Sequence, residues 1–224
     1  MQHGFIVTHN ESGGTLLCRI LATNLRVHCY GNTGLVYDHP TVIERARKRI
    51  DETLGQNVGI VDASCVYLDK LLKNHEFTWK PFYQMCKFIY LVRSPLVPLT
   101  NMVGKGLPVF GAENYYLFRL RRMCEMAKKS GGVLLTYEDL VSKRAFPLIK
   151  NYLGMKSGFL DRFTPLSFDE PNLLKGKIIT NPVELVADIP KDVLHRCTTG
   201  YNRYLDFMQT RTNLIRFSAS TVLA

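Results

Sequence analysis

Residues 4–21 read GFIVTHNESGGTLLCRIL, and this stretch decides the fold. The short apolar run Gly4–His9 is typical of a buried strand, and the apolar residues from Leu16 to Leu25 recur at helical spacing. Between them lies the polar loop Asn10–Gly14. Glycines in such a loop let successive N–H groups turn toward an anion at the helix N-terminus. A plain tight turn explains the same residues, so this loop alone does not identify a site.

Strands and helices alternate along the rest of the chain. We expect further buried strands at Val58–Val61, Lys87–Val92 and Val133–Thr136. A helix should begin near Thr41, whose spacing to Glu44 predicts a capping box, and later helices are expected at Asn114–Lys129, Glu138–Leu153 and Pro190–Met208. This alternation predicts a three-layer α/β fold with a mostly parallel central sheet flanked by helices. Ligands of such sheets bind beyond the carboxyl ends of the strands.

The composition predicts one folded domain over residues 1–224, with 210–224 as a frayed tail. Of the 224 residues, 46% are hydrophobic and 21% are charged, which excludes a disordered chain. No apolar run approaches the roughly 18 residues that a membrane span requires, and the start shows no basic-then-apolar leader. The six cysteines are scattered, which predicts buried thiols in a reducing compartment and no metal site. We therefore expect a soluble, cytoplasmic protein.

The net charge of +10 implies an affinity for anions, which include nucleic acids, phosphorylated cofactors and sulfated or acidic substrates. Arg119, Arg121 and Arg122 on one expected helix motivate a nucleic-acid-binding module. We disfavour it because aromatic residues are not interleaved with these arginines as stacking platforms. A kinase of the P-loop type is also disfavoured, since no Lys-Ser/Thr pair follows the glycines.

Two further motifs follow expected strands. Residues 88–95 read FIYLVRSP, so Arg93 ends a strand before a proline and a helix, with Thr100 and Asn101 further along. A fixed guanidinium with a hydroxyl or amide beyond it suits a shared anion, although Arg93 alone could simply be exposed at a strand end. Residues 131–140 read GGVLLTYEDL, a strand that leads through Tyr137 into a helix.

Together these motifs resemble those of the sulfotransferases that use 3′-phosphoadenosine 5′-phosphosulfate (PAPS). Residues 8–17, THNESGGTLL, resemble the family loop TYPKSGTTWL, and Arg93-Ser94-Pro95 with Asn101 resembles an R-x-P motif followed by a serine. Residues 134–140 and 152–154 resemble the family's YEDL turn and FLG helix end. The resemblance implies a P-loop-like sulfotransferase architecture and transfer of a sulfuryl group from PAPS to a hydroxyl or amine. The acceptor would be a small molecule or saccharide, with no metal and no membrane involved.

The resemblance also implies a role for each matching residue. The 5′-phosphosulfate would be bound by Ser12, Gly13, Gly14 and Thr15. The 3′-phosphate of PAPS, or of the product PAP, would be held by Arg93 and Asn101 with Thr100, and Tyr137 would lie near the adenine. Lys175 lies in a Lys-Gly-Lys run that resembles a basic loop closing over that phosphate.

Lys73-Asn74-His75 resembles the Lys-Thr-His of hydroxyl-accepting members, in which the histidine is the general base. His75 is therefore the expected base and Lys73 a catalytic cation, with Glu76 in reserve. A surface or core histidine is the alternative interpretation of His75.

Glu11 is the main departure, because the family has a lysine or arginine at that position. A carboxylate about 4 Å from an anion, at an effective dielectric constant of 20, costs roughly 4 kcal/mol. Glu11 then either points outward while Lys73 or Lys105 supplies the cation, or transfers a proton itself as a catalytic residue. In the third alternative the chain is a catalytically weak or inactive PAP/PAPS-binding protein. The oligomeric state stays open, and a homo-oligomer is compatible with the sequence.

Overall fold

The computed structural model describes residues 2–24, 26–29, 31–55, 65–73, 76–155 and 187–216. The strands of these residues form one six-stranded sheet in the order β2-β3-β1-β4-β5-β6. Their bounds are β1 Gln2–Thr8, β2 Val27–Cys29, β3 Val66–Leu71, β4 Lys87–Val92, β5 Gly132–Thr136 and β6 Leu214–Arg216. Every pairing is parallel. The expected α/β class is confirmed, and the described sheet is parallel throughout.

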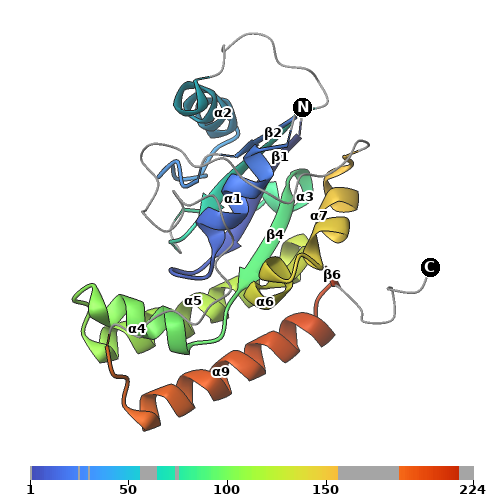
Figure 1. The fold of residues 1–224 in the computed structure, drawn as a ribbon. Helices are drawn as coiled ribbons and strands as arrows, with labels where there is room; N and C mark the ends of the chain where they lie inside the picture. The colour runs from blue at the N-terminus through green and yellow to red at the C-terminus, as the bar shows by residue number, and fades with distance from the viewer. Residues whose placement is uncertain are drawn as a thin grey trace.

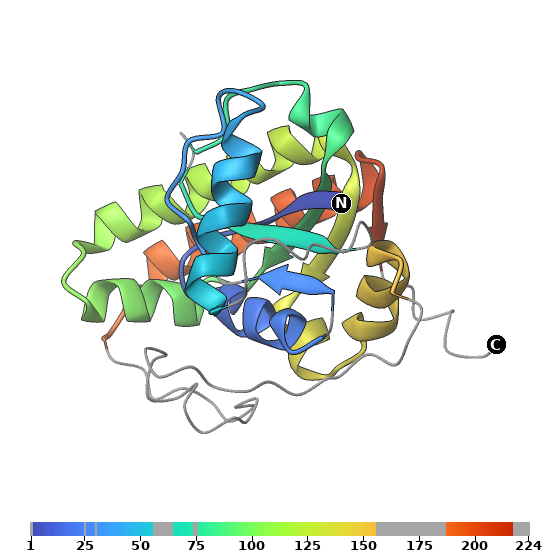
Figure 2. The ribbon, with the colours of Figure 1, turned by 90° about the horizontal axis from the view of Figure 1, so that it is seen from above.

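Helices cover both faces of the sheet, which gives the three expected layers (Figures 1 and 2). One face is covered by α1 (Gly14–Ala22), α6 (Tyr137–Val141) and α7 (Ala145–Leu153). The other face is covered by α2 (Val42–Leu54), α3 (Phe82–Met85), α5 (Val109–Ser130) and α9 (Lys191–Thr210). The remaining described helix, α4 (Leu96–Gly104), follows β4.

The central strands are buried on both faces. Phe5 and Val7 of β1 pack into the core under α5, whereas Ile6 between them packs into the core under α1. In β4, Phe88 likewise packs into the core under α5 and Ile89 into the core under α1. Successive side chains of a strand point to opposite faces, so burial of both faces requires the continuous apolar runs that the sequence shows.

The topology places a switch point at β1. This strand lies between β3 and β4. The chain builds β2 and β3 on one side of β1 and then crosses to β4 on the other side. Ligands of open parallel sheets bind beyond the carboxyl edge at such a point. The loop Asn10–Gly13 lies there, at the edge of the sheet where Figure 1 shows α4.

One local expectation fails in the first half of the chain, and another is not tested. The strand expected at Val58–Val61 lies outside the described residues, and the structure has a further strand, β3, at Val66–Leu71. The capping box expected at Thr41 and Glu44 is wrong. Thr41 has helical backbone angles and no capping hydrogen bond, and its hydroxyl lies 3.0 Å from Nδ1 of His39.

Three boundaries differ in the second half. The helix expected at Asn114–Lys129 already begins at Val109, since Pro108 supplies the N-cap. The helix expected at Glu138–Leu153 divides into α6 and α7, because Lys143 between them takes a left-handed φ of 63°. Leu214–Arg216, expected in a frayed tail, pairs with β5 as β6.

The six cysteines are free thiols, and all but the half-buried Cys86 are buried. None of the described helices combines the length and the apolar character that crossing a bilayer requires.

Candidate functional site

The loop after β1 presents backbone N–H groups at the start of α1. Gly13 is the N-cap in a left-handed conformation (φ 91°), and no side chain caps the helix. The amides of Gly13, Gly14 and Thr15 have no hydrogen-bond acceptor among the described residues. Unpaired N–H groups and the positive end of the helix dipole coincide here. The first turn of α1 therefore has the geometry of an anion-binding site.

The two hydroxyl groups of this loop face different ways. Ser12 is buried, and its Oγ donates to the carbonyl of His9 at 2.8 Å and contacts Oγ1 of Thr8. The Ser12 hydroxyl therefore forms its hydrogen bonds within the loop and the end of β1. Thr15 is half-buried, and its Oγ1 accepts a hydrogen bond from Nζ of Lys70 at 2.8 Å.

Lys70 is the functional candidate that sequence reasoning missed. It lies on β3, beside β1, and its side chain passes so close to the loop that a Cβ on Gly14 would lie 3.1 Å from Lys70 Cδ. The residue is 9% exposed, and no described residue forms an ion pair with it. A buried cation therefore stands beside the unpaired amides. A lysine inside an apolar strand was the available signal, since a buried lysine requires an anionic partner.

The second and third motifs meet the loop. The guanidinium carbon of Arg93 lies 3.7 Å from the centre of the Tyr137 ring, and Nη1 donates to the carbonyl of Glu11 at 3.1 Å. The same ring packs against Gly13, where a Cβ would lie 2.7 Å from Tyr137 Cδ2. The structure thus brings Arg93, Tyr137 and the glycine loop into direct contact. Burial lowers the pKa of Arg93, but a guanidinium remains charged at neutral pH.

His9 fixes Arg93 relative to the loop. Its Nδ1 lies 2.8 Å from the carbonyl of Asn10, and its Nε2 accepts from the backbone N–H of Arg93 at 3.1 Å. Burial lowers the pKa of His9 to about 4. The ring is therefore neutral at pH 7, with Nδ1–H as the donor and Nε2 as the acceptor that these contacts need.

Two tyrosines of α5 hold the neighbouring loops in place. The Tyr115 hydroxyl accepts from the backbone N–H of Asn10 at 3.1 Å and donates to the carbonyl of Leu72 at 3.3 Å. The Tyr116 hydroxyl donates to the carbonyl of Arg93 at 2.7 Å. One helix thus positions the segments that follow β1, β3 and β4.

Arg119, one helical turn further on, joins two strand ends directly. Its guanidinium donates to the carbonyls of Thr8 and Leu71, at 2.8 and 2.5 Å, and the residue is 1% exposed. Arg119 therefore cannot contact a nucleic acid. Of the three arginines that motivated that alternative, only Arg121 and Arg122 have access to solvent.

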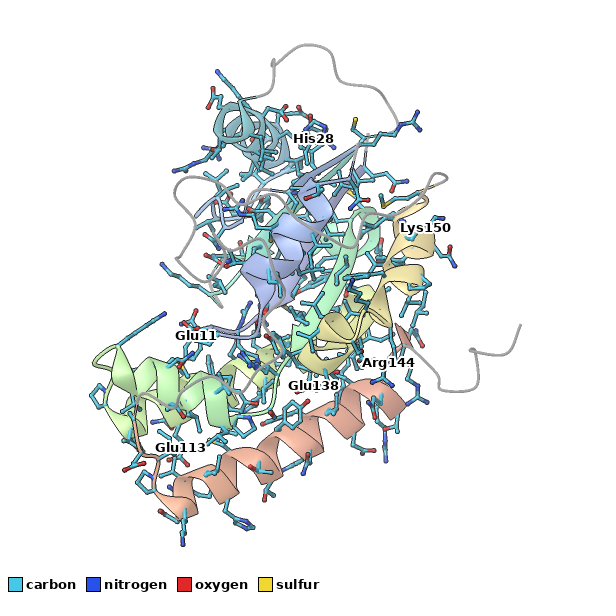
Figure 3. All side chains as sticks on the ribbon, in the orientation of Figure 1. Glu11, His28, Glu113, Glu138, Arg144 and Lys150 are labelled. Carbon is cyan, nitrogen blue, oxygen red and sulfur yellow. The ribbon has the colours of Figure 1, made fainter. Side chains whose placement is uncertain are left out.

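Glu11 lies beside α4 (Figure 3) and contacts Asn101 of that helix and Lys105, the residue that follows it. Its backbone is left-handed (φ 61°), and its Oε1 accepts from Nζ of Lys105 at 2.6 Å. Oε2 lies 3.4 Å from the side-chain amide of Asn101. Lys105 therefore neutralises Glu11, and the cation beside the first turn of α1 is Lys70.

The remaining expected residues lie in different surroundings. Thr100 is fully buried, and its hydroxyl donates to the carbonyl of Leu96 at 2.6 Å within α4. Lys73 is exposed, and its backbone N–H donates to the carboxylate of Glu76 at 2.8 Å. His75 and Lys175 fall outside the described residues.

Glu76, the reserve base, is an anchor of the loop after β3. It is 2% exposed, and its carboxylate also accepts from the backbone N–H of Leu72 at 2.8 Å and from the amide of Asn32 at 3.0 Å. The carboxylate is thus fully engaged in holding the loop. Within the described part of the chain, no group of histidine, cysteine and acidic side chains is arranged to hold a metal ion.

The turn after β5 sets the direction in which Tyr137 leaves the sheet. Thr136 and Asp139 form a capping box, in which the Thr136 hydroxyl accepts from the backbone N–H of Asp139 at 3.2 Å. The Asp139 carboxylate accepts in return from the backbone N–H of Thr136 at 3.1 Å. This exchange fixes the start of α6, so Tyr137 leaves the sheet in a defined direction.

Comparison with known proteins shows which fold this is. The sequence matches no protein-family model and no functionally curated protein. The structure is similar to the sulfotransferase domain of the Synechococcus PCC 7002 olefin synthase, with a TM-score of 0.55, 16% identity, and coverage of 90% of this chain and 94% of that domain. It is also similar to a sulfotransferase from Alicyclobacillus acidocaldarius, with a TM-score of 0.50, 10% identity and 98% of each chain covered. The chain has the P-loop-like fold of these sulfotransferases.

Proposed function

We propose that this protein transfers a sulfuryl group from PAPS to a hydroxyl or amine of a small-molecule or saccharide acceptor. One observation carries the proposal. At the switch point of a sulfotransferase fold, the uncapped first turn of α1 has the buried Lys70 on β3 beside it and the Arg93–Tyr137 pair against its glycine loop. Cations and unpaired amides gathered at one edge of a sheet suit a ligand with more than one anionic group.

Each group has a place in the proposed complex. The amides of Gly13, Gly14 and Thr15, with Lys70, receive the 5′-phosphosulfate. Arg93 and Asn101 receive the 3′-phosphate, and Tyr137 lies against the adenine. This division follows the resemblance, and it is supported by the contacts that bring Arg93, Tyr137 and Gly13 together.

The chain's contribution to the chemistry is then mainly electrostatic. As the acceptor oxygen or nitrogen bonds to sulfur, the bond from sulfur to the 5′-phosphate oxygen breaks and PAP leaves with added negative charge. The amides at the start of α1 and the ammonium of Lys70 stabilise that charge. The acceptor's proton passes to a base, for which we propose His75. Glu76 beside it is committed to backbone N–H groups.

A second function is favoured by Glu11. A carboxylate stands in the loop where sulfotransferases carry a cation, and this suits a protein that binds PAP or PAPS with little turnover. Lys70 weakens this alternative because the neighbouring strand supplies a cation beside the first turn of α1, while Lys105 pairs with Glu11.

Binding and turnover measured together test the proposal. Titration calorimetry with PAP gives the affinity, and radiolabelled PAPS with a panel of phenols, alcohols, amines and saccharides gives the transfer. Binding with a sulfated product supports the enzyme, and binding without product on any acceptor supports the second function. If neither PAP nor PAPS binds, both functions are wrong.

The cytoplasmic location belongs to the same proposal. It is supported by the free state of all six cysteines, which a reducing compartment maintains.

A further inference from the structure

Hydrogen-bond donors of a second anion site converge on Glu11. Nζ of Lys105 lies 2.6 Å from Oε1 of Glu11, and Nδ2 of Asn101 lies 3.4 Å from Oε2. Nη1 of Arg93 donates to the Glu11 backbone carbonyl at 3.1 Å. Two of these donors, Arg93 and Asn101, are the ones that the proposed function gives to the 3′-phosphate. A residue of the chain itself already uses them.

A carboxylate and a phosphate compete for such donors. Both are anions that accept hydrogen bonds from guanidinium, ammonium and amide groups. Two anions held a few ångströms apart by shared donors repel each other strongly at the low effective dielectric of a half-buried site. The 3′-phosphate and the Glu11 carboxylate therefore cannot both bind Asn101 and Lys105, whereas Arg93 contacts the Glu11 backbone carbonyl and not the carboxylate.

We propose that Glu11 is a specificity-determining residue whose carboxylate competes with the 3′-phosphate of the donor nucleotide, and that Lys105 changes partner from Glu11 to that phosphate. The inference rests on the proposed function, because it takes the donor to carry a 3′-phosphate. Its consequence is a protein that gains little affinity from the 3′-phosphate. Such a protein discriminates weakly between PAP and adenosine 5′-monophosphate (AMP).

The geometry allows this exchange. The Lys105 side chain is 62% exposed, so its ammonium has room to follow a new partner, whereas the Glu11 side chain is 25% exposed. The Asn101 contact, at 3.4 Å, is at the long limit of a hydrogen bond and is readily given up.

The 5′-phosphate end is separate from this competition. Lys70 contacts Thr15, whereas the Glu11 carboxylate contacts Asn101 of α4 and Lys105 just after that helix. A change at Glu11 should therefore alter the affinity for PAP and leave that for AMP nearly unaltered. This difference separates competition for the 3′-phosphate from a general change in the loop.

The test compares Glu11→Gln with wild type by titration calorimetry against PAP and AMP. The amide keeps the size of the side chain and removes its charge. We expect the affinity for PAP to rise about tenfold and that for AMP to change less than about twofold. Glu44→Gln is the matched control, because it removes the same charge from an exposed residue of α2 and should leave both affinities unaltered.

Lys105→Met provides a second measurement. Combined with Glu11→Gln, it should lower the affinity for PAP about fivefold relative to Glu11→Gln alone, with AMP unaffected. If Glu11→Gln leaves the ratio of PAP to AMP affinities unaltered while PAP still binds, the inference is wrong and the proposed function stands. If PAP binds to neither wild type nor Glu11→Gln, both are wrong.

Discussion

Replacing Lys70 with methionine should weaken nucleotide binding without weakening the fold. Methionine keeps an unbranched apolar stem and removes the ammonium and its hydrogen bond to Thr15. In the protein without ligand, Lys70 is 9% exposed and no described residue pairs with its charge. The folded state therefore bears a desolvation cost for this charge, which the hydrogen bond to Thr15 reduces and a bound anion would reduce further.

The magnitude follows from the position of Nζ beside the first turn of α1. Two opposite unit charges about 4 Å apart attract by about 4 kcal/mol at an effective dielectric constant of 20, and a hydrogen bond to a charged group contributes about 1.5–3 kcal/mol. We take about 2–3 kcal/mol for the lost contact, which lowers PAP affinity roughly 30- to 150-fold. The lost Lys70–Thr15 hydrogen bond also involves a charged group and costs about 1.5–3 kcal/mol, and removal of the buried charge offsets it.

Two measurements on the same sample check this prediction. Calorimetry with PAP should show the loss of affinity, and denaturant unfolding should show a free energy of unfolding equal to or above that of wild type. Lys48→Met is the matched control, because Lys48 is an exposed residue of α2 and its loss changes the net charge equally. Unaltered PAP affinity in Lys70→Met, or a loss matched by Lys48→Met, would refute the reasoning.

Three further changes test other parts of the structure. Arg93→Ala should lower PAP affinity about 10- to 150-fold in calorimetry through loss of a charge-assisted contact, and wild-type affinity would show that Arg93 does not face the nucleotide. Gly13→Ala should lower the free energy of unfolding by about 1–3 kcal/mol, because φ is 91° and the new Cβ would lie 2.7 Å from Tyr137 Cδ2. Gly55→Ala is its control, because Gly55 is a left-handed glycine with open space around it. An equal loss of unfolding free energy in Gly55→Ala would show that the contact with Tyr137 adds nothing to the cost. His3→Phe should flatten the pH dependence of stability, since burial lowers the pKa of His3 to about 3 and both ring nitrogens lack partners among the described residues. The unfolded chain binds a proton below about pH 6.5 and the folded chain does not, so wild type should lose about 2 kcal/mol relative to His3→Phe between pH 7.5 and 5 in denaturant unfolding. Parallel pH profiles would contradict this.

The fold could be predicted where burial alone determines the residue types. The apolar runs of β1, β4 and β5 were recognisable because both of their faces are covered. β3 was not recognised, because Asp69 interrupts its apolar pattern. That carboxylate is satisfied by the hydroxyls of Thr33 and Tyr37, which lie far away in the sequence. Burial raises the pKa of Asp69 to about 6, so even with these partners its charge is costly in the core.

Some residues of the candidate site could be recognised from short sequence motifs, whereas the roles of others depend on contacts with residues far away in the sequence. Gly13, Arg93 and Tyr137 could be identified because each lies in a short motif at the end of an expected strand. His9 and Tyr116 could not, since their roles depend on hydrogen bonds to Arg93 from residues 84 and 23 positions away. Such contacts exist only once the sheet has brought the strand ends together.

Glu11 shows what this dependence means for the chemistry of the loop. The sequence left open where its carboxylate points, and the structure pairs it with Lys105, 94 positions away. The cation that a sulfotransferase loop normally carries has a counterpart in Lys70, on a strand hydrogen-bonded along its length to β1. A cation held by the sheet loses less freedom on binding than one on a loop, so in the proposed function its charge is better positioned for the leaving phosphate. Under that proposal Glu11 adjusts which nucleotide binds, whereas Lys70 stabilises the charge that develops during the transfer.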